Sequence, residues 1–422
     1  MQTVCFKTLG CKVNQYETQA IREQLNNLGL TETTDAADVY IINTCTVTKK
    51  SDDESKRTIR RALKSNPNAF VLVTGCYAEK DRDELSNMDG VSAIVSNIKK
   101  PSIPSILLGQ NIVEDNIFKF SISDFAGHTK AFVKIQDGCD RFCSFCKIPF
   151  VRGRSKSRQI RDVVEEVKRL VNKGFKEVVL TGICLGSYGR DFKDGTNLVK
   201  LIDELEKIDF NFRARLSSID PEDITEELIK RFATSKKLCR HLHAPLQSGD
   251  DDILEAMNRR YTASKFIGLI NKIKNSIEDV AITLDVMVGF PGEAEINFKN
   301  TLETVKEISP LRIHIFPYSK RDGTKAAKFT DVVASNVVKD RIERLKGLQK
   351  EMSYNFRRHF IGKELEVLVE TKRDKSTGLL KGYSDNYIKI LFYGSDELMR
   401  DLVRVKVLEV THDFTLGRQN GG

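Results

Sequence analysis

Short apolar runs alternate with longer amphipathic stretches in the first part of the chain. The runs are Thr3–Lys7, Val39–Asn43 and Phe70–Thr74, and a polar turn and a helical pattern of apolar positions follow each one. Apolar runs of about four to eight residues predict buried strands, and apolar positions three or four residues apart predict helices. Strands that alternate with helices form a parallel sheet. We therefore expect an N-terminal parallel α/β domain over residues 1–112.

The same alternation resumes in the middle of the chain. Six further runs there predict strands: Ala131–Gln136, Glu177–Thr181, Arg213–Ser217, Leu242–Ala244, Ala281–Val288 and Arg312–Phe316. Six successive βα units suggest a partial (βα)6 barrel, in which the chemistry lies on the loops at the carboxyl ends of the strands. We assign this domain to residues 125–357, with a charged helical stretch from residue 331 to 359 near its end.

The tail of the chain has a different pattern. Apolar and polar residues alternate along four short segments, which predict the strands of a small all-β barrel. These segments are Glu364–Glu370, Leu379–Tyr383, Ile388–Phe392 and Val403–Val410. We assign residues 358–422 to this barrel. Tyr383, Tyr387, Phe392 and Tyr393 are candidates for stacking on RNA bases, although we expect at least half of them to pack in the core.

Composition narrows the class of protein. The chain has 422 residues, of which 40% are hydrophobic and 30% charged, as in soluble proteins with more than one domain. No apolar run is long enough to cross a bilayer, and the first residues lack the charged and apolar regions of a signal peptide. We expect a cytoplasmic protein without membrane association. In that reducing compartment the nine cysteines indicate metal ligation and not a disulfide scaffold.

One stretch of the chain is strongly basic. The formal net charge is +9, and residues 147–161 contain six Lys and Arg residues with no Asp or Glu. This stretch is a candidate patch for RNA phosphates, with Arg152, Arg154 and Arg158 as its main contacts. The alternatives are a solvated surface, which is the common fate of charged runs, or a role for Arg152 and Arg154 in holding the N-terminal domain against the core.

Three cysteines lie close together after the first predicted barrel strand. Cys139, Cys143 and Cys146 are spaced so that one short loop presents three thiolates to one face of an iron-sulfur cluster. One iron then has no protein ligand and remains open to a small molecule. A structural zinc site is the alternative, but it requires four ligands. His128 is the nearest candidate for the fourth and lies across a predicted strand, so we favour the cluster.

Three other cysteines each follow a predicted strand of the N-terminal domain. They are Cys11, Cys45 and Cys76. The carboxyl ends of parallel strands meet at one edge of the sheet, so these thiols, distant in sequence, have the position to form a second three-cysteine site. Any one of them alone would be interpreted as a small buried apolar residue. Three at equivalent positions favour the site.

The segment Cys139–Cys146 reads CDRFCSFC and resembles the CxxxCxΦC motif of radical S-adenosylmethionine enzymes, with Phe145 as the aromatic residue. The resemblance implies a 4Fe-4S cluster whose open iron chelates S-adenosylmethionine. One-electron reduction then gives a 5′-deoxyadenosyl radical that abstracts a hydrogen from the substrate. It also implies a one-electron reductant of the flavodoxin or ferredoxin type.

The N-terminal cysteines and the tail extend the resemblance over nearly the whole chain. Together they resemble the methylthiotransferase family, which has an N-terminal three-cysteine domain, a radical core and a C-terminal TRAM domain. The resemblance implies that Cys11, Cys45 and Cys76 hold an auxiliary 4Fe-4S cluster that carries the sulfur to be inserted. A second S-adenosylmethionine would supply the methyl group.

Three segments resemble the MtaB type of this family: Thr8–Asn14 (TLGCKVN), His241–Gly249 (HLHAPLQSG) and Phe316–Thr324 (FPYSKRDGT). This type implies methylthiolation at C2 of threonylcarbamoyladenosine, next to the anticodon in a tRNA anticodon stem-loop. The adenine C2–H is unactivated, so a radical suits the reaction and a general base does not. The alternatives are a methylthiotransferase for isopentenyladenosine in tRNA or for a ribosomal-protein aspartate. A non-catalytic iron-sulfur RNA-binding protein is the alternative from another class.

The resemblance also implies contacts to S-adenosylmethionine at the ends of the barrel strands. Phe145 would contact the adenine, Gly182 the methionyl end, Ser217 the ribose, and Gln247 and Gly289 the nucleoside side. For the two glycines, a turn that requires positive φ is an equal alternative.

Some residues depart from the family pattern or match no motif. Lys147 and Ala294 stand where relatives usually have an aliphatic residue and a threonine. We interpret Cys5 and Cys239 as packing residues, and we expect Cys184 to border the active site. We expect the enzyme to be a monomer.

Overall fold

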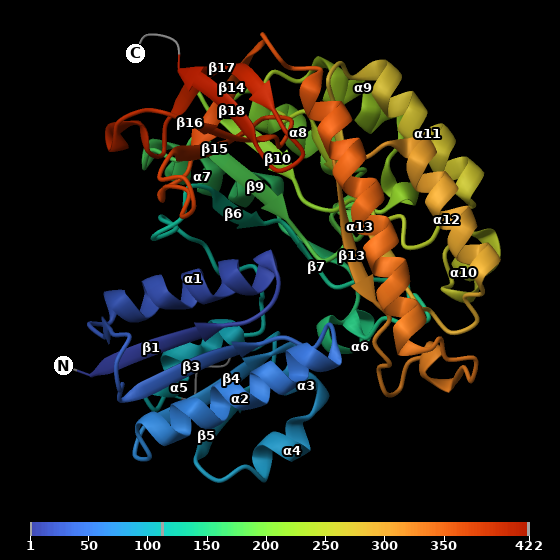
Figure 1. Cartoon of the computed structure of the whole chain (residues 1–422). Helices are drawn as coiled ribbons and strands as arrows, with labels where there is room; N and C mark the ends of the chain where they lie inside the picture. Colours follow the sequence, from blue (N-terminus) through green and yellow to red (C-terminus); the bar gives the residue numbers. More distant parts are fainter. Residues whose placement is uncertain (1, 111–113, 420–422) are drawn as a thin grey trace.

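The computed structural model describes residues 2–110 and 114–419. The predicted domain limits at residues 1, 112 and 422 lie outside this part of the chain. Figure 1 shows the N-terminal sheet, the central strands with their outer helices, and the C-terminal barrel as three successive bodies.

Residues 2–110 form a parallel sheet of five strands, with the order β2-β1-β3-β4-β5. The strands are β1 (Thr3–Thr8), β2 (Thr31–Glu32), β3 (Val39–Thr44), β4 (Phe70–Gly75) and β5 (Val91–Val95). The helices are α1 (Lys12–Asn27), α2 (Lys49–Ser65), α3 (Cys76–Lys80), α4 (Arg82–Ser86) and α5 (Ile103–Leu107). All six residues of β3 are buried, as expected for a central strand covered on both faces. The predicted parallel α/β domain is confirmed.

Within residues 114–357, six parallel strands form two sheets, β6-β9-β10 and β11-β12-β13. A bridge between Ala214 and Leu238 joins the two sheets at β10, so the six strands make one open barrel. The strands are β6 (Ala131–Lys134), β9 (Glu177–Thr181), β10 (Arg213–Leu216), β11 (His241–His243), β12 (Ala281–Val288) and β13 (Arg312–Pro317). A short pair, β7 (Gln136–Asp137) and β8 (Lys156–Ser157), flanks the cysteine loop. The partial barrel is confirmed.

Helices cover the outside of this barrel (Figure 1). They are α7 (Ile160–Asn172), α8 (Leu198–Glu206), α9 (Glu226–Thr234), α10 (Asp251–Ala256), α11 (Ala263–Ser276) and α12 (Glu295–Ile308), whereas the short helix α6 (Ile148–Arg152) follows the cysteine loop and packs against α3 of the N-terminal domain. In α7 the buried residues Val163, Val167, Leu170 and Val171 recur every three or four positions. This spacing gives one apolar stripe, which packs on the strands.

The tail is a closed barrel with the strand order β14-β15-β16-β18-β17. Its strands are β14 (Glu364–Val369), β15 (Leu380–Ser384), β16 (Lys389–Phe392), β17 (Leu402–Val410) and β18 (Thr415–Gln419). Helix α13 (Ser335–Arg358) packs against β13 of the central barrel and leads into the C-terminal barrel. The predicted small β-barrel is confirmed. Of its four candidate aromatics, Phe392 is buried in the core, Tyr393 is 76% exposed, and Tyr383 and Tyr387 stack on each other.

A buried carboxylate joins the central barrel to the tail. Glu177 on β9 forms ion pairs with Arg213 Nε at 2.6 Å and Arg215 Nε at 2.8 Å. The same guanidinium groups donate to the backbone of the tail, from Arg213 to Tyr383 O at 2.7 Å and from Arg215 to Asp385 O at 2.8 Å. Burial opposes ionisation of Glu177, but its basic neighbours outweigh this effect and hold its pKa well below the usual range.

Replacement of Glu177 by glutamine tests this junction. We expect Glu177→Gln to lower the free energy of unfolding by about 3–5 kcal/mol, because Arg213 and Arg215 remain buried without a compensating charge. Glu226→Gln is the matched control, since Glu226 forms an exposed ion pair with Lys272, and we expect it to leave stability unchanged. Chemical denaturation measures both variants. Equal losses would contradict the role of Glu177.

The pH dependence of stability in the wild type and in Glu177→Gln gives a second test of this junction. Because the pKa of Glu177 is lower in the folded chain than its unfolded value of about 4.3, its contribution is complete above that unfolded pKa. The contribution is lost as pH falls through the folded-state pKa. The stabilities of the wild type and Glu177→Gln should therefore converge in acid and differ at neutral pH.

Candidate functional site

Cys11, Cys45 and Cys76, here called the N-terminal triad, all lie at the carboxyl edge of the first sheet. Cys11 precedes α1, Cys45 follows β3, and Cys76 begins α3 directly after β4. Gly10 has φ +91°, and a Cβ there would lie 2.7 Å from Cys45 Sγ, so a glycine allows the two loops to approach. Burial raises the pKa of the Cys45 thiol, and the nearby sulfurs of Cys76 and Cys11 raise it further. The fold thus brings the three thiols together.

Cys139, Cys143 and Cys146, here called the loop triad, are half-buried in the loop after β7. Each sulfur accepts a hydrogen bond. The donors are Arg141 N to Cys139 at 3.5 Å, Ile148 N to Cys146 at 3.5 Å, and Arg259 Nη1 to Cys143 at 3.4 Å. N–H donors directed at cysteine sulfurs are typical of thiolate cluster ligands and tune their potential. The loop triad therefore fits an anionic cluster.

A buried arginine connects the N-terminal triad to the barrel. The Arg152 side chain is fully buried at the end of α6. It donates to Cys76 Sγ at 3.3 Å, to Glu17 Oε1 at 2.7 Å, to Asp137 Oδ2 at 3.0 Å and to Asn14 Oδ1. Glu17 and Asn14 belong to α1, whereas Asp137 belongs to β7. One guanidinium group thus joins the two sheets beside a triad cysteine.

The charges around Arg152 do not cancel. Lys134 Nζ lies 2.7 Å from Glu17 Oε1 and 2.6 Å from Asp137 Oδ2, and Lys100 also pairs with Glu17. The three cations, Arg152, Lys134 and Lys100, and the two carboxylates, Glu17 and Asp137, together carry a formal charge of +1, and all five are buried. An unpaired buried charge is costly. Thiolates or an anionic cluster at the N-terminal triad would balance this excess, so the donor set fits such a group.

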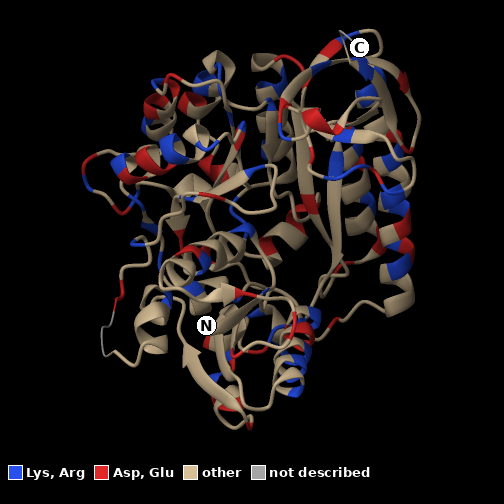
Figure 2. Cartoon of the chain, turned by 90° about the vertical axis from the view of Figure 1, so that its left-hand side faces the viewer, with Lys and Arg blue, Asp and Glu red and all other residues tan. Residues whose placement is uncertain are grey.

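The prediction that Arg152 and Arg158 contact RNA phosphates is wrong. Arg152 is held as described above, and Arg158 is buried against Glu166, at 2.7 Å, and the Tyr16 hydroxyl, at 3.2 Å. The alternative that Arg152 holds the N-terminal domain against the core is confirmed. Arg154 is 75% exposed and stays a candidate for RNA contact. Basic and acidic residues are interspersed in the view of Figure 2, so RNA contacts depend on local placement.

A cavity of about 210 Å³ lies between the loop triad and the segment that follows Cys45. Its wall contains Cys146 and Phe145 from the loop triad segment, residues 46–48 that directly follow Cys45, and side chains from β12 and β13. The Cys146 thiol has its pKa raised to about 12 by burial and by Cys143, and the sulfur of Cys76 is also near enough to contribute. A molecule in this cavity would therefore contact Cys146 of the loop triad and the segment next to Cys45 of the N-terminal triad.

The residues expected to contact S-adenosylmethionine fall into two groups. Phe145 and Gln247 line the cavity. Gln247 has φ +66°, and its Oε1, like Ser217 Oγ, is buried without a hydrogen-bond partner among the described residues. Buried polar atoms of this kind are available to a ligand or an ordered water. The alternative of a positive φ is confirmed at Gly289, where φ is +75°, whereas at Gly182 close packing excludes a side chain, since a Cβ would lie 2.7 Å from Gln136 Oε1.

The three remaining cysteines have distinct surroundings. Cys5 and Cys239 are buried and pack in the core, as predicted. Cys184 Sγ lies 3.7 Å from Asp223 Oδ2. A hydrogen bond with Cys139, together with burial, raises the pKa of Cys184, which places this thiol next to the loop triad. No helix in the described ranges has the length and hydropathy needed to span a membrane.

Family models match both segments of the chain that carry the triads. Residues 133–305 match the Radical SAM superfamily, and residues 3–96 match Uncharacterized protein family UPF0004. The threonylcarbamoyladenosine tRNA methylthiotransferase MtaB of Bacillus subtilis (strain 168) is 38% identical, over 99% of this chain and 96% of its own. The chain belongs to the radical S-adenosylmethionine methylthiotransferase family.

Relatives of another specificity are nearly as similar to this methylthiotransferase. The tRNA-2-methylthio-N(6)-dimethylallyladenosine synthase of Fusobacterium nucleatum is 35% identical, over 97% of this chain and 98% of its own. Among solved structures, the radical S-adenosylmethionine methyltransferase TsrM from Kitasatospora setae has a TM-score of 0.54 at 13% identity, covering 75% of this chain and 74% of its own. That likeness concerns the fold alone. Membership of the radical family implies a 4Fe-4S cluster and S-adenosylmethionine.

Sequence reasoning missed several residues of the methylthiotransferase site. Arg259 carried no signal, because it lies far along the chain from its partner Cys143. For Glu17 the sequence did contain a signal, because this acid lies on the buried face of α1, between Tyr16 and Ala20. A carboxylate on an apolar helix face indicates a buried cation partner, because acids are almost never fully buried unless paired.

Replacement of Arg152 tests how the two sheets are joined. We expect Arg152→Met to lower the free energy of unfolding by about 3–5 kcal/mol, because Glu17 and Asp137 lose a buried partner. Arg154→Ala, two residues away and exposed, is the control and should leave stability unchanged. Chemical denaturation and limited proteolysis between the two sheets measure the effect. Identical behaviour of the two variants would show that Arg152 does not join the domains.

Proposed function

We propose that this enzyme inserts a methylthio group at C2 of threonylcarbamoyladenosine, adjacent to the anticodon of tRNA. The observation that carries the proposal is the cavity lined by Cys146 of the loop triad and by residues 46–48, which directly follow Cys45 of the N-terminal triad. Replacement of an aromatic C–H by a sulfur group requires hydrogen removal and sulfur delivery at the same carbon. We assign residues 1–112, 125–357 and 358–422 to the auxiliary-cluster, radical and TRAM domains.

The two triads have separate roles in this proposal. The loop triad would hold a 4Fe-4S cluster that binds S-adenosylmethionine through its open iron, and the N-terminal triad would hold a second 4Fe-4S cluster. When bound, these groups supply a radical able to remove hydrogen from an unactivated carbon and the sulfur that replaces it. A one-electron reductant of the flavodoxin or ferredoxin type is required. We place the enzyme in the cytoplasm, as a monomer, with its tRNA.

The side chains around the cavity position the reactants. Phe145, Met287 and Phe316 give the cavity an apolar wall, which keeps water away from reactive species. The free polar atoms of Ser217 and Gln247 have the positions to orient S-adenosylmethionine. Gly182 and Gly289 stay predictions as cofactor contacts.

Other side chains stabilise the cysteine thiolates or are available to bind RNA. Arg259 and Arg152 donate to Cys143 and Cys76, one sulfur in each triad. These bonds stabilise the thiolate form that cluster binding requires. Exposed Arg154 and Tyr393 are available for contacts with the anticodon stem-loop.

Cluster content tests the two triads. Anaerobic reconstitution of the full chain should give two 4Fe-4S clusters, and the combined change Cys139→Ala, Cys143→Ala and Cys146→Ala should leave one, because the N-terminal triad is untouched. Iron and sulfide analysis with electron paramagnetic resonance measures this. Retention of both clusters, or loss of both in a variant that stays folded, would contradict the assignment.

The modified nucleoside tests the substrate. Nucleoside mass spectrometry of tRNA treated with the reconstituted enzyme, S-adenosylmethionine and a reductant should show 2-methylthio-threonylcarbamoyladenosine. The matched substrate is tRNA from a strain that lacks the threonylcarbamoyl group. Formation of only the methylthio derivative of dimethylallyladenosine would reject the proposed substrate in favour of the other specificity found among the relatives.

A further inference from the structure

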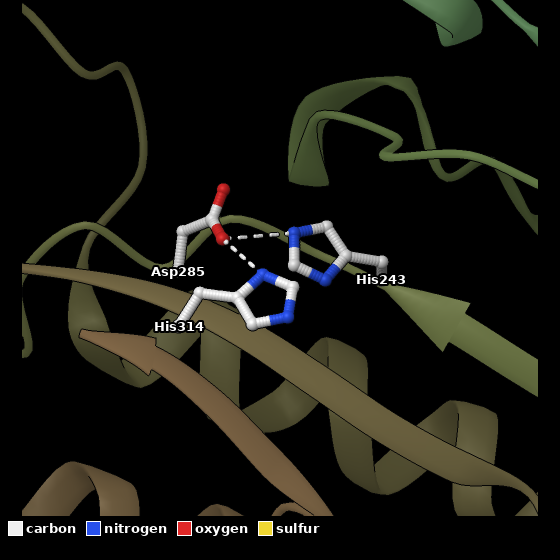
Figure 3. A group of neighbouring side chains, drawn as sticks. All are labelled: His243, Asp285 and His314. Atoms are coloured by element: carbon white, nitrogen blue, oxygen red, sulfur yellow. Dashed lines mark hydrogen bonds and ion pairs between the residues drawn. The ribbon is translucent and has the colours of Figure 1, made fainter. Parts of the chain in front are cut away.

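A group of ionisable side chains lies on the inner face of the barrel, apart from the cysteines. His243 on β11, Asp285 on β12 and His314 on β13 come from three adjacent strands and point toward one another (Figure 3). His243 Nε2 and His314 Nδ1 each lie 3.1 Å from Asp285 Oδ1, and the two imidazole rings stack with centroids 5.1 Å apart. We call these residues the lumen trio.

Hydrogen bonds fix the orientation of the lumen trio. The ionised carboxylate accepts only, so both imidazole nitrogens that face Asp285 donate. His243 is held on its other side by Thr283 Oγ1, 2.8 Å from Nδ1. Within the described residues, Asp285 Oδ2 and His314 Nε2 have no partner, and the His314 side chain is 54% exposed. Two polar atoms on a rigid support thus face the interior of the open barrel.

The lumen trio lies directly beneath the cavity between the triads. Met287 and Phe316, which line that cavity, stand two positions beyond Asp285 and His314 on the same strands. Alternate residues of a strand face the same side, and two residues span roughly 6.6 Å. The trio is therefore one side-chain layer deeper in the barrel than the proposed site of reaction.

A basic cavity lies next to the lumen trio. Its volume is about 380 Å³, and its wall includes Lys12, Lys130, Arg215 and Tyr387. The Tyr387 ring stacks on His241, and Thr283, which contacts His243, also bonds His241 Nε2 at 3.0 Å. The deep end of the barrel therefore combines hydrogen-bonding groups with positive charge, a setting suited to a polar, anionic substituent.

We propose that the lumen trio is the subsite for the N6-threonylcarbamoyl group of the target adenosine. The proposal rests on the function proposed above. In a purine nucleoside the ribose and N6 lie at opposite ends of the base. With C2 between the triads and the ribose toward the RNA outside, N6 points into the barrel. Asp285 Oδ2 accepts from a carbamoyl N–H, His314 Nε2 accepts from the threonyl hydroxyl because its proton is on Nδ1, and the basic cavity receives the carboxylate.

The same subsite disfavours a hydrocarbon substituent. A dimethylallyl group would displace water from Asp285 and His314 and return no hydrogen bond. A buried polar atom that loses its hydrogen-bond partner costs more binding free energy than a few extra apolar contacts contribute. Sites built for polar groups therefore reject apolar analogues strongly. The lumen trio thus separates two substrates that the overall identities of the relatives, 38% and 35%, leave unresolved.

The experiment compares Asp285→Asn and His314→Phe with the wild type, as full-length reconstituted proteins. Two anticodon stem-loops of one sequence carry either threonylcarbamoyladenosine or dimethylallyladenosine. We expect both variants to lower kcat/KM on the threonylcarbamoyl substrate by roughly ten- to a hundred-fold. The value on the dimethylallyl substrate should stay unchanged or rise. Formation of 5′-deoxyadenosine without RNA should be equal in all proteins, because it does not involve the N6 substituent.

The matched control is His359→Phe. His359 pairs with Asp279 at 3.1 Å and is 59% exposed, close to the values for His314, but it lies at the end of α13, outside the barrel. This variant should keep the wild-type ratio between the two substrates. If His314→Phe loses iron or stability, the nearly isosteric Asp285→Asn carries the test.

The outcomes separate this proposal from the one on which it rests. A wild type that acts on neither threonylcarbamoyl stem-loop nor tRNA would reject the proposed function. A wild type that does act, with variants that lose equal factors on both stem-loops or nothing on either, would overturn the subsite alone. Stoichiometric binding of zinc to the wild type that Asp285→Asn abolishes would also overturn it, because a metal would then occupy the trio.

Discussion

The ion pair between Arg152 and Glu17 is the contact on which the two-sheet arrangement depends. It joins a helix of the N-terminal sheet to the loop region of the barrel, with no solvent access to either partner. Bidentate pairing of a guanidinium with a carboxylate fixes orientation as well as distance. The carboxyl edges of both sheets are thereby held against each other. The cavity lined by Cys146 and by the segment after Cys45 lies between these two edges.

Placement of this ion pair also has an electrostatic consequence. Arg152 reaches Cys76 with one nitrogen, while the surrounding network keeps an excess of positive charge beside the N-terminal triad. Buried cations stabilise anionic sulfur and oppose its protonation. The contact that docks the domain is therefore also the one that favours thiolates in it. Domain docking and cluster binding should reinforce each other, since each supplies a charge that the other needs.

Local sequence patterns were sufficient for most strands but not for contacts between distant elements. The run Val39–Asn43 was predicted as a strand and lies in the wholly buried β3. In contrast, β2 consists of only two residues, both exposed, and β18 reads TLGRQ, with no clear alternation. Pairing with β16 and β17, which no local pattern reveals, makes β18 a strand. The cysteines were placed correctly at strand ends because that position follows from the strands alone.

Charged residues were the least predictable from sequence. Arg152 and Arg158 lie in an uninterrupted basic run, and such runs are usually solvated. Their acidic partners come from α1, β7 and α7, so the basic run itself gives no sign of them. The lumen trio was missed for the same reason, because its members lie on three separate strands. In each case the pairing exists only in the folded chain.

The barrel interior is polar over much of its depth, which distinguishes it from closed barrels filled with branched apolar side chains. Glu177 with Arg213 and Arg215 lies at the tail end, and the lumen trio lies between this group and the triads. Such an interior is tolerated only if each charge has a partner or a ligand. At the tail end the backbone of the C-terminal barrel supplies the partners, and its Tyr387 covers His241. The tail therefore closes the end of the barrel opposite the triads, which makes it the floor of the substrate site proposed above.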